Sequence, residues 1–461
     1  MTFMFGIIRY NLIISNISVI FTSKKMKRKI SDALVNWKNG KNRKPLILNG
    51  ARQVGKTYIL QEFGRNHFEN VVEINFEIDK PLCEFLENDI DPFRIIQYLE
   101  LTSGKIIAAG KTLIIFDEIQ ACHRALTSLK YFCEQAPEFH VIAAGSLLGV
   151  AVNREKYSFP VGKVDELKMF PMDFEEFLWA MGKKLLADII RENYTGNQVM
   201  QESLHHLAIE LFLKYFIVGG MPEAVGKFAE TESYLRVQQI QNNILNEYIA
   251  DMAKYADPST SIKIRACFDS IPAQLAKGNA KFQYKVVQRG GTSTIFGEAI
   301  EWLVYAGIAM KCQNIEHGYI PIKAYADISS FKLYMGDIGL LTLRSMMPLQ
   351  TILSPFSENN TFLGAMTENY MAQVLTSKEI PVFYWNSQGK AEVDFVLQDG
   401  SNVIPIEVKS GVRVRSRSLG VFMERYKSPY GIRISRKNFG FENNIKSVPL
   451  YAAFCCCGKP G

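Results

Sequence analysis

A glycine-rich loop between a predicted strand and a predicted helix constrains this chain more than any other feature. The loop matches the pattern GxxxxGK[ST] and consists of Gly50, Ala51, Arg52, Gln53, Val54, Gly55, Lys56 and Thr57. An apolar run at residues 45–49 precedes it, and the helix-compatible stretch YILQEF follows it. Glycines let backbone N–H groups curl around phosphate oxygens, and the helix N-terminus adds positive partial charge. We therefore predict an ATP-binding loop in which Lys56 reaches the β- and γ-phosphates and Thr57 binds Mg²⁺.

Two further predicted strands deliver polar side chains to the same place. Residues 113–116 are fully apolar and end at Asp117 and Glu118. Asp117 can hold Mg²⁺, and Glu118 can orient and deprotonate water, which favours ATP hydrolysis over the phosphoryl transfer of a nucleotide kinase. A third strand at 141–145 ends at Ser146. We expect Ser146 to contact the γ-phosphate; the alternative is a helix N-cap, a role that serine also favours.

The length and the rhythm of apolar runs predict the domain organisation. The chain has 461 residues, enough for two to four domains, and 48% hydrophobic with 21% charged residues is typical of folded proteins. Short apolar runs alternate with longer helix-compatible stretches, as in buried parallel sheets. We predict an N-terminal extension and helix at 1–40 and an α/β domain with a parallel sheet at 41–175.

The remaining chain divides into three predicted segments. Residues 176–258 have helical apolar spacing and suit a helical lid or linker. Residues 259–345 contain two predicted helices and then short strands, which is the order of a winged helix; a generic helical connector explains the pattern equally well. Residues 346–461 begin with a helix and continue with strands, which predicts a second, small α/β domain.

The N-terminal segment and the cysteines favour a cytoplasmic protein. The apolar run from residue 3 to 21 is interrupted by Arg9, Asn11 and Asn16, which disfavours a membrane span. Basic residues follow this run instead of preceding it, which disfavours a secretory signal. Met26 opens a stretch that resembles a natural start, so the preceding residues are expected to be an upstream-start artefact or a loose extension. No CxxC pair is present among the eight cysteines, which favours reduced thiols.

Several motifs together carry a family resemblance. They are LNGARQVGKT, IIFDEIQ, AAGSLLGV, FPVGKVDELKMFPMDFEEF, GGMPEAV, KLYMGDIGLL, AEVDFVLQ and IPIEVKSG, spread over residues 46–411. In these the chain resembles predicted AAA-type ATPases of bacteria and archaea that carry a C-terminal domain of unknown function. The resemblance implies an AAA-type core, a winged-helix-like middle and a tail similar to PD-(D/E)xK nucleases.

The resemblance also implies a second candidate site, in the tail. In a PD-(D/E)xK-like tail, an acidic residue on one strand and an E-x-K on the next bind a metal and position water. The matching residues are Asp394, Glu407 and Lys409, with Glu368 on the preceding helix as a fourth group. An E-x-K by itself is a weak signal, since a half-exposed strand provides it freely.

A local cluster of basic residues suggests a partner. The net charge of +7 settles no partner, but residues 409–437 carry nine basic residues against one acidic residue, which attracts a nucleic-acid backbone. Arg413, Arg415 and Arg417 alternate, so they could line a DNA-binding face or keep an edge strand soluble.

Two hypotheses follow. The first is an ATPase that couples hydrolysis to DNA binding or processing. The alternative is a nucleotide-controlled protein-interaction switch with an inactive tail. Neither Arg124 nor Arg154 is singled out as an arginine finger by spacing, and Lys163 stands where some branches of the resembled family carry an arginine. A finger acting in trans would require a homo-oligomer.

Overall fold

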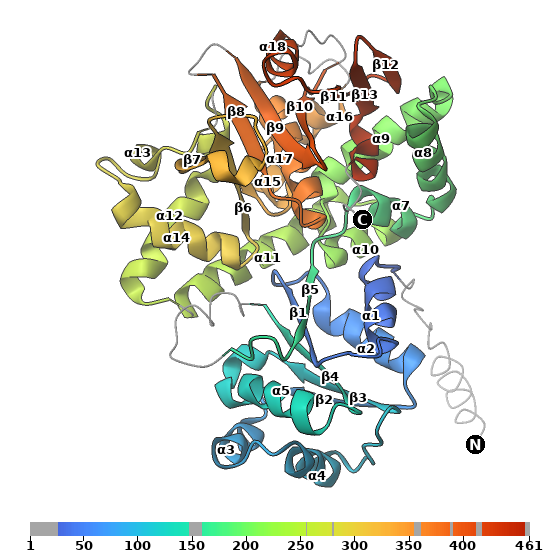
Figure 1. The fold of residues 1–461 in the computed structure, drawn as a ribbon, viewed down its shortest axis with the longest axis vertical. Helices are drawn as coiled ribbons and strands as arrows, with labels where there is room; N and C mark the ends of the chain where they lie inside the picture. Colours follow the sequence, from blue (N-terminus) through green and yellow to red (C-terminus); the bar gives the residue numbers. More distant parts are fainter. Residues whose placement is uncertain are drawn as a thin grey trace, which may run out of the picture.

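The computed structural model describes residues 26–146, 159–254, 256–278, 281–354, 361–387, 391–411 and 417–456. Within these ranges, a lower parallel sheet and an upper mixed sheet are joined by a helical region (Figure 1). The extension up to residue 25 and the arginines Arg154, Arg413 and Arg415 lie outside the described residues. Among the described helices, none is both long and apolar enough to cross a membrane.

The described part of the N-terminal half contains a five-stranded sheet in the order β2-β3-β4-β1-β5, with all neighbours parallel. Its strands are β1 (Leu46–Gly50), β2 (Asn70–Asn75), β3 (Thr112–Asp117), β4 (His140–Gly145) and β5 (Asp165–Met169). β3 and β4 are buried along their whole length, which is why each reads as a continuous apolar run. The predicted parallel α/β sheet is confirmed.

Helices cover both faces of this sheet. They are α1 (Ile30–Lys38), α2 (Lys56–His67), α3 (Lys80–Asn88), α4 (Pro92–Ser103) and α5 (His123–Gln135). Along β1, Leu46 and Leu48 pack into the core that contains α1 and α2, whereas Ile47 packs into the core that contains α3, α4 and α5. Side chains alternate across a strand, so both faces are apolar and the loops at the strand ends are left to carry polar groups.

A helical region follows β5. It comprises α7 (Phe174–Ala180), α8 (Lys184–Gly196), α9 (Glu202–Val218), α10 (Pro222–Thr231), α11 (Tyr234–Lys254), α12 (Pro258–Leu275), α13 (Tyr284–Val287) and α14 (Ser293–Tyr305). Between α9 and α10 the backbone passes so close to the backbone of Met172 that only glycine fits. A Cβ on Gly220 would lie 2.1 Å from the Met172 backbone oxygen, and Gly219 has φ +71°.

The C-terminal half contains, within its described residues, an eight-stranded mixed sheet in the order β12-β13-β11-β10-β9-β8-β6-β7. The strands are β6 (Ala309–Ile315), β7 (Ala326–Met335), β8 (Phe383–Asn386), β9 (Glu392–Asp399), β10 (Asn402–Val408), β11 (Gly431–Ser435), β12 (Gly440–Glu442) and β13 (Ile445–Pro449). The accompanying helices are α15 (Ile338–Arg344), α16 (Leu349–Leu353), α17 (Thr361–Ser377) and α18 (Arg417–Tyr426). β9 and β10 pair as an antiparallel hairpin.

This sheet differs from the predicted division of the chain at residue 345. The hairpin of β6 and β7 belongs to the segment predicted to be winged-helix-like, yet β6 pairs in parallel with β8 of the tail. The hairpin therefore forms one edge of the C-terminal sheet, and α12 and α14 pack together beside it. The separate units expected at 259–345 and 346–461 therefore share one sheet. The pairing joins residues about 70 positions apart, and a local sequence pattern does not predict such long-range pairing.

Candidate functional site

The glycine-rich loop connects β1 to α2 and has a backbone shape that its sequence permits. Gly55 has φ +91° and Gln53 has φ +65°, and α2 begins directly at Lys56. A Cβ on Gly50 would lie 2.2 Å from the Met169 backbone oxygen of β5. Glycine at positions 50 and 55 therefore lets the loop curl against β5 and present backbone N–H groups at the start of a helix.

Lys56 is folded back onto the loop. Its Nζ donates hydrogen bonds to the backbone oxygens of Gly50 and Ala51, both at 2.9 Å. Burial lowers the pKa of Lys56 to about 8, although the charges of Glu118 and Asp117 act in the opposite direction. A buried ammonium group held mainly by carbonyl oxygens is well placed to exchange these weak partners for phosphate oxygens.

The two predicted Mg²⁺ ligands lie side by side. Thr57 Oγ1, at the start of α2, donates a 2.8 Å hydrogen bond to Asp117 Oδ2, at the end of β3. A hydroxyl and a carboxylate oxygen at this separation are the hard ligands that Mg²⁺ prefers, so the donor set fits the ion. Glu118 follows in a left-handed conformation with φ +49°, and the Gln120 side chain donates a hydrogen bond to its carboxylate.

Ser146 lies directly after β4, the neighbour of both β1 and β3. Its Oγ is buried and has no hydrogen-bond partner among the described residues. A buried hydroxyl without a partner is costly unless a ligand or water completes it. The alternative role as an N-cap would involve the residues after 146, which lie outside the described part of the chain.

Side chains from distant elements hold the loop, and no motif or spacing in the sequence marks them. Arg52 forms ion pairs with Asp251 (2.7 Å) and Glu247 (3.3 Å), both on α11. Gln53 donates a 2.7 Å hydrogen bond to Glu247 as well. From the other side, Arg28 donates a 2.9 Å hydrogen bond to the Val54 backbone oxygen. These partners lie 26 to 199 positions away from the loop residues that they contact.

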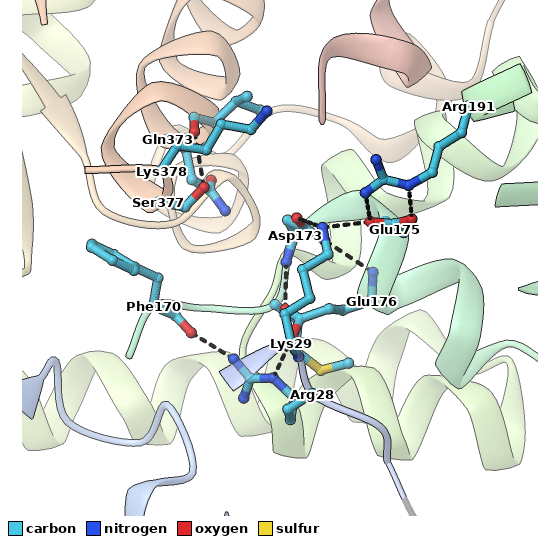
Figure 2. A network of polar contacts seen from close by, with 12 residues as sticks. Arg28, Lys29, Phe170, Asp173, Glu175, Glu176, Arg191, Gln373, Ser377 and Lys378 are labelled. Carbon is cyan, nitrogen blue, oxygen red and sulfur yellow. Dashed lines mark hydrogen bonds and ion pairs between the residues drawn. The ribbon is translucent and has the colours of Figure 1, made fainter. Parts of the chain in front are cut away.

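The residues around Arg28 continue into a network that joins the start of α1 to α7 (Figure 2). Arg28 forms a buried ion pair with Glu176 at 3.1 Å, and Glu176 closes a capping box with Asp173 at the start of α7. Lys29 pairs with Asp173 and Glu175, whose charges raise the pKa of Lys29 even though burial acts to lower it. The network ties the loop to the helical region by paired charges.

The residues discussed for an arginine finger have ordinary partners. Lys163 forms a 2.9 Å ion pair with Glu134, and Arg124 Nε donates a hydrogen bond to the Leu86 backbone oxygen. Neither contact reaches the glycine-rich loop. The finger and the homo-oligomer that it would need stay predictions.

The four residues predicted for the tail site gather at the C-terminal sheet. Asp394 Oδ2, on β9, accepts a 2.7 Å hydrogen bond from the backbone N–H of Val408. Lys409 Nζ lies 3.1 Å from Glu407 Oε1 and 3.9 Å from Asp394 Oδ2. Burial raises the pKa of Asp394 to about 7, and the charge of Glu368 on α17 adds to the shift.

Three residues that the sequence reasoning missed, Lys332, Glu392 and Tyr334, lie at the same site. Lys332, on β7, contacts Glu368 and also Glu392, on β9. Tyr334 donates a 3.0 Å hydrogen bond to Glu368 from the same strand. The available signal was a single charged residue inside the apolar stretch FKLYM, where an unpaired lysine would be costly. We refer to Lys332, Glu368, Glu392, Asp394, Glu407 and Lys409 as the tail cluster.

Comparisons with known protein families give three matches along the chain. Residues 42–178 match a family described as AAA domain, residues 209–350 match a domain of unknown function (DUF8612), and residues 363–453 match a second one (DUF4143). The first match covers the five-stranded sheet and the glycine-rich loop. A search of curated proteins found no match.

Solved structures were also compared. A Walker-type ATPase of Pyrococcus abyssi is 16% identical, with a TM-score of 0.43, and the match covers 70% of this chain and 97% of that one. The ORC1 protein of Aeropyrum pernix in complex with DNA is 13% identical, with a TM-score of 0.29, over 71% and 93% of the two chains. The RuvB Holliday junction branch migration motor of Thermotoga maritima is 13% identical, with a TM-score of 0.30, over 62% and 89%.

Proposed function

We propose that this chain is a Mg²⁺-dependent ATPase. The observation that carries the proposal is the meeting of Lys56, Thr57 and Asp117 at one edge of a parallel sheet, with Thr57 Oγ1 2.8 Å from Asp117 Oδ2. The match of residues 42–178 to the AAA domain family supports it. An ion at this edge would be held by Thr57 and Asp117 and would neutralise phosphate charge.

The other residues have separate roles in the proposed reaction. Lys56 leaves the carbonyl oxygens of Gly50 and Ala51 and pairs with the β- and γ-phosphates. Glu118 orients the attacking water and accepts its proton, while Gln120 holds the Glu118 carboxylate in place. The buried, unpartnered Oγ of Ser146 donates to a γ-phosphate oxygen.

Two single substitutions test these roles. Lys56→Ala removes the charge that pairs with phosphate, so ATP binding and turnover are both expected to be lost. Glu118→Gln keeps the shape and removes the base, so binding persists while turnover falls by about 100-fold or more. Nucleotide titration and phosphate release measure the two effects. An equal loss of nucleotide affinity in both variants would remove Glu118 from its proposed role.

We further propose that turnover is coupled to DNA through the C-terminal half. Arg417 and Arg425, on α18, are exposed and line a cavity of about 1040 Å³ together with Asn314, His317 and Asn386. Guanidinium groups with nearby amide and imidazole groups suit a phosphate backbone. DNA is then expected to raise the rate of ATP turnover.

The test combines DNA stimulation with salt dependence. Arg417→Ala combined with Arg425→Ala should weaken DNA binding and lower the slope of log K against log salt by up to about 1.8, since each lost phosphate contact removes about 0.9. Turnover without DNA should persist. Arg65→Ala combined with Arg94→Ala removes two exposed arginines from the N-terminal half instead and should leave the slope unchanged. Equal DNA binding by both double variants would contradict the coupling.

The alternative is a nucleotide-controlled switch, and one observation favours it. Arg52 and Gln53 of the loop are bound to α11, and α11 packs against α15, which leads into the C-terminal sheet. ATP that draws Arg52 towards its phosphates would change this connection. Under the switch hypothesis, DNA leaves turnover unchanged, so the same stimulation assay separates the two functions.

A further inference from the structure

The tail cluster contains a lysine where a nuclease-like site would need a metal ion. Lys332 is 1% exposed, and its Nζ lies 2.6 Å from Glu392 Oε1 and 3.2 Å from Glu368 Oε2. These two carboxylates come from β9 and α17, so the ammonium group bridges a strand and a helix. Without this ammonium group, the carboxylates of Glu368 and Glu392 would lose their shared counter-ion and repel each other.

The charge of Lys332 is maintained by its surroundings. Burial acts to lower its pKa, but the charges of Glu368, Glu392 and Asp394 outweigh burial, and the pKa is raised above its ordinary value. The Tyr384 ring lies 5.0 Å from Nζ and adds a further favourable contact. Lys332 is therefore paired with two carboxylates within the cluster.

The other half of the cluster is also bridged by a lysine. Lys409 Nζ lies between Glu407 Oε1 and Asp394 Oδ2, and Asp394 Oδ2 already accepts the Val408 N–H. Glu407 Oε2 is the buried oxygen that has no hydrogen-bond partner. Across the described residues, no three histidine, cysteine, aspartate or glutamate side chains are arranged to hold a metal ion.

We propose that Lys332 serves as the permanent counter-ion of the tail cluster, in the place of a divalent metal. Mg²⁺ needs several oxygen ligands in near-octahedral geometry, and Lys332 withholds two carboxylates from any such set. A dication would also sit beside an ammonium group in a buried site, where repulsion is strong. The cluster then organises the sheet and α17, and it does not recruit Mg²⁺ for phosphodiester cleavage.

The proposal predicts a gain of metal binding when the lysine is removed. Lys332→Met keeps the aliphatic volume and frees the carboxylates of Glu368 and Glu392. Mn²⁺ is the probe, measured by electron paramagnetic resonance without nucleotide, on an Asp117→Asn background that removes the loop site. The variant should bind about one Mn²⁺ per chain at least about tenfold more tightly than the parent.

Lys311→Met is the matched control. Lys311 lies on the adjacent strand β6, is 83% buried by side chain and pairs with Glu301 at 2.6 Å, outside the tail cluster. It should gain no Mn²⁺ site. A parent protein that binds one Mn²⁺ and loses it in Glu407→Gln would overturn the proposal, and so would a folded Lys332→Met variant that binds no more Mn²⁺ than the control.

A second measurement does not depend on the folding of Lys332→Met. The unsubstituted protein is incubated with supercoiled plasmid and Mg²⁺ or Mn²⁺, and the nicked product is followed with time. No nicking above that of an Asp394→Asn variant is expected. Metal-dependent nicking that Asp394→Asn abolishes would show that the cluster recruits a metal despite Lys332.

Discussion

Lys56 gives nucleotide binding a pH dependence that can be worked out at a single residue. Burial sets its pKa to about 8 in the nucleotide-free protein, so the side chain is half protonated at pH 8. Bound phosphates favour the charged form. ATP binding should therefore take up about half a proton at pH 8 and almost none near pH 6.5. Calorimetry with Mg-ATP in buffers of different ionisation enthalpy measures this uptake.

Lys56→Arg provides the control for this prediction. A guanidinium group stays charged across the same range, so the variant should bind nucleotide, if more weakly, without proton uptake. In the absence of nucleotide, Lys56 of the folded protein binds fewer protons than Lys56 of the unfolded chain between pH 8 and 10.5. The contribution of this lysine to the free energy of unfolding therefore increases as the pH rises through that window. Uptake that persists in the arginine variant would assign the proton to another group.

At the scale of single residues, the sequence predicts candidate site residues that lie within one short motif. The loop residues, Asp117 and Glu118 could be named because each stands at a fixed place relative to a strand end. Glu247, Asp251 and Lys332 could not be named, because their partners come from other elements and no spacing marks them. Lys332 left the faint signal of a charge within an apolar strand, which predicts a buried partner without identifying it.

At the scale of elements, one carboxylate joins the turn after α9 to the start of α15. Asp337 Oδ2 accepts the Gly220 N–H at 2.7 Å, and Oδ1 accepts the Leu340 N–H at 3.0 Å. Asp337→Ala leaves two buried N–H groups without partners, so the free energy of unfolding should fall by about 2–4 kcal/mol. Urea unfolding followed by circular dichroism measures the loss.

Asp257→Ala is the matched control for that change. Asp257 also caps a helix, by accepting the N–H groups of Ser259 and Thr260 at the start of α12, but it is exposed. Water can replace the lost acceptor, so the expected cost is about 0.5–1 kcal/mol. Equal losses in the two variants would mean that burial of the Asp337 contacts adds nothing.

Elements were easier to predict than their pairing. Buried strands such as β3, β4 and β10 follow apolar runs, and the parallel direction of the strands in the first sheet follows from alternating strands and helices. Short strands were expected in the segment that forms β6 and β7, whereas the pairing of β6 with β8 depends on chain segments that meet only in the folded state. A winged helix and a sheet edge have the same local pattern of helices followed by short strands.

For the whole molecule, the contacts between the loop and α11 are the connection through which, under the proposed switch, nucleotide binding would act on the C-terminal half. Asp251→Asn removes one negative charge from the surroundings of Lys56 and releases Arg52 from its 2.7 Å ion pair. ATP should then bind about three- to tenfold more tightly, because repulsion of the phosphates falls and Arg52 can reach them. A fluorescent nucleotide titration measures the change.

Glu230→Gln removes an equivalent charge from α10, where Glu230 pairs with Lys227 at the surface. It should leave ATP affinity within about twofold of the parent, because exposed charges are screened. Weaker ATP binding in Asp251→Asn would show that the ion pair holds Arg52 in its binding position instead of withholding it.

The order of synthesis matters for a core that spans both halves. Phe174, at the start of α7, lies 6.4 Å ring to ring from Phe454, and the His205 ring on α9 hydrogen-bonds the Tyr451 hydroxyl at 2.8 Å. Residues near 451 leave the ribosome long after α7 and α9, because roughly 250 residues are added in between, at about 5–20 residues per second. Until then, the apolar side chains of α7 and α9 that contact this segment stay uncovered. During that interval of some tens of seconds the nascent chain should be a strong client for chaperones that hold exposed apolar helices.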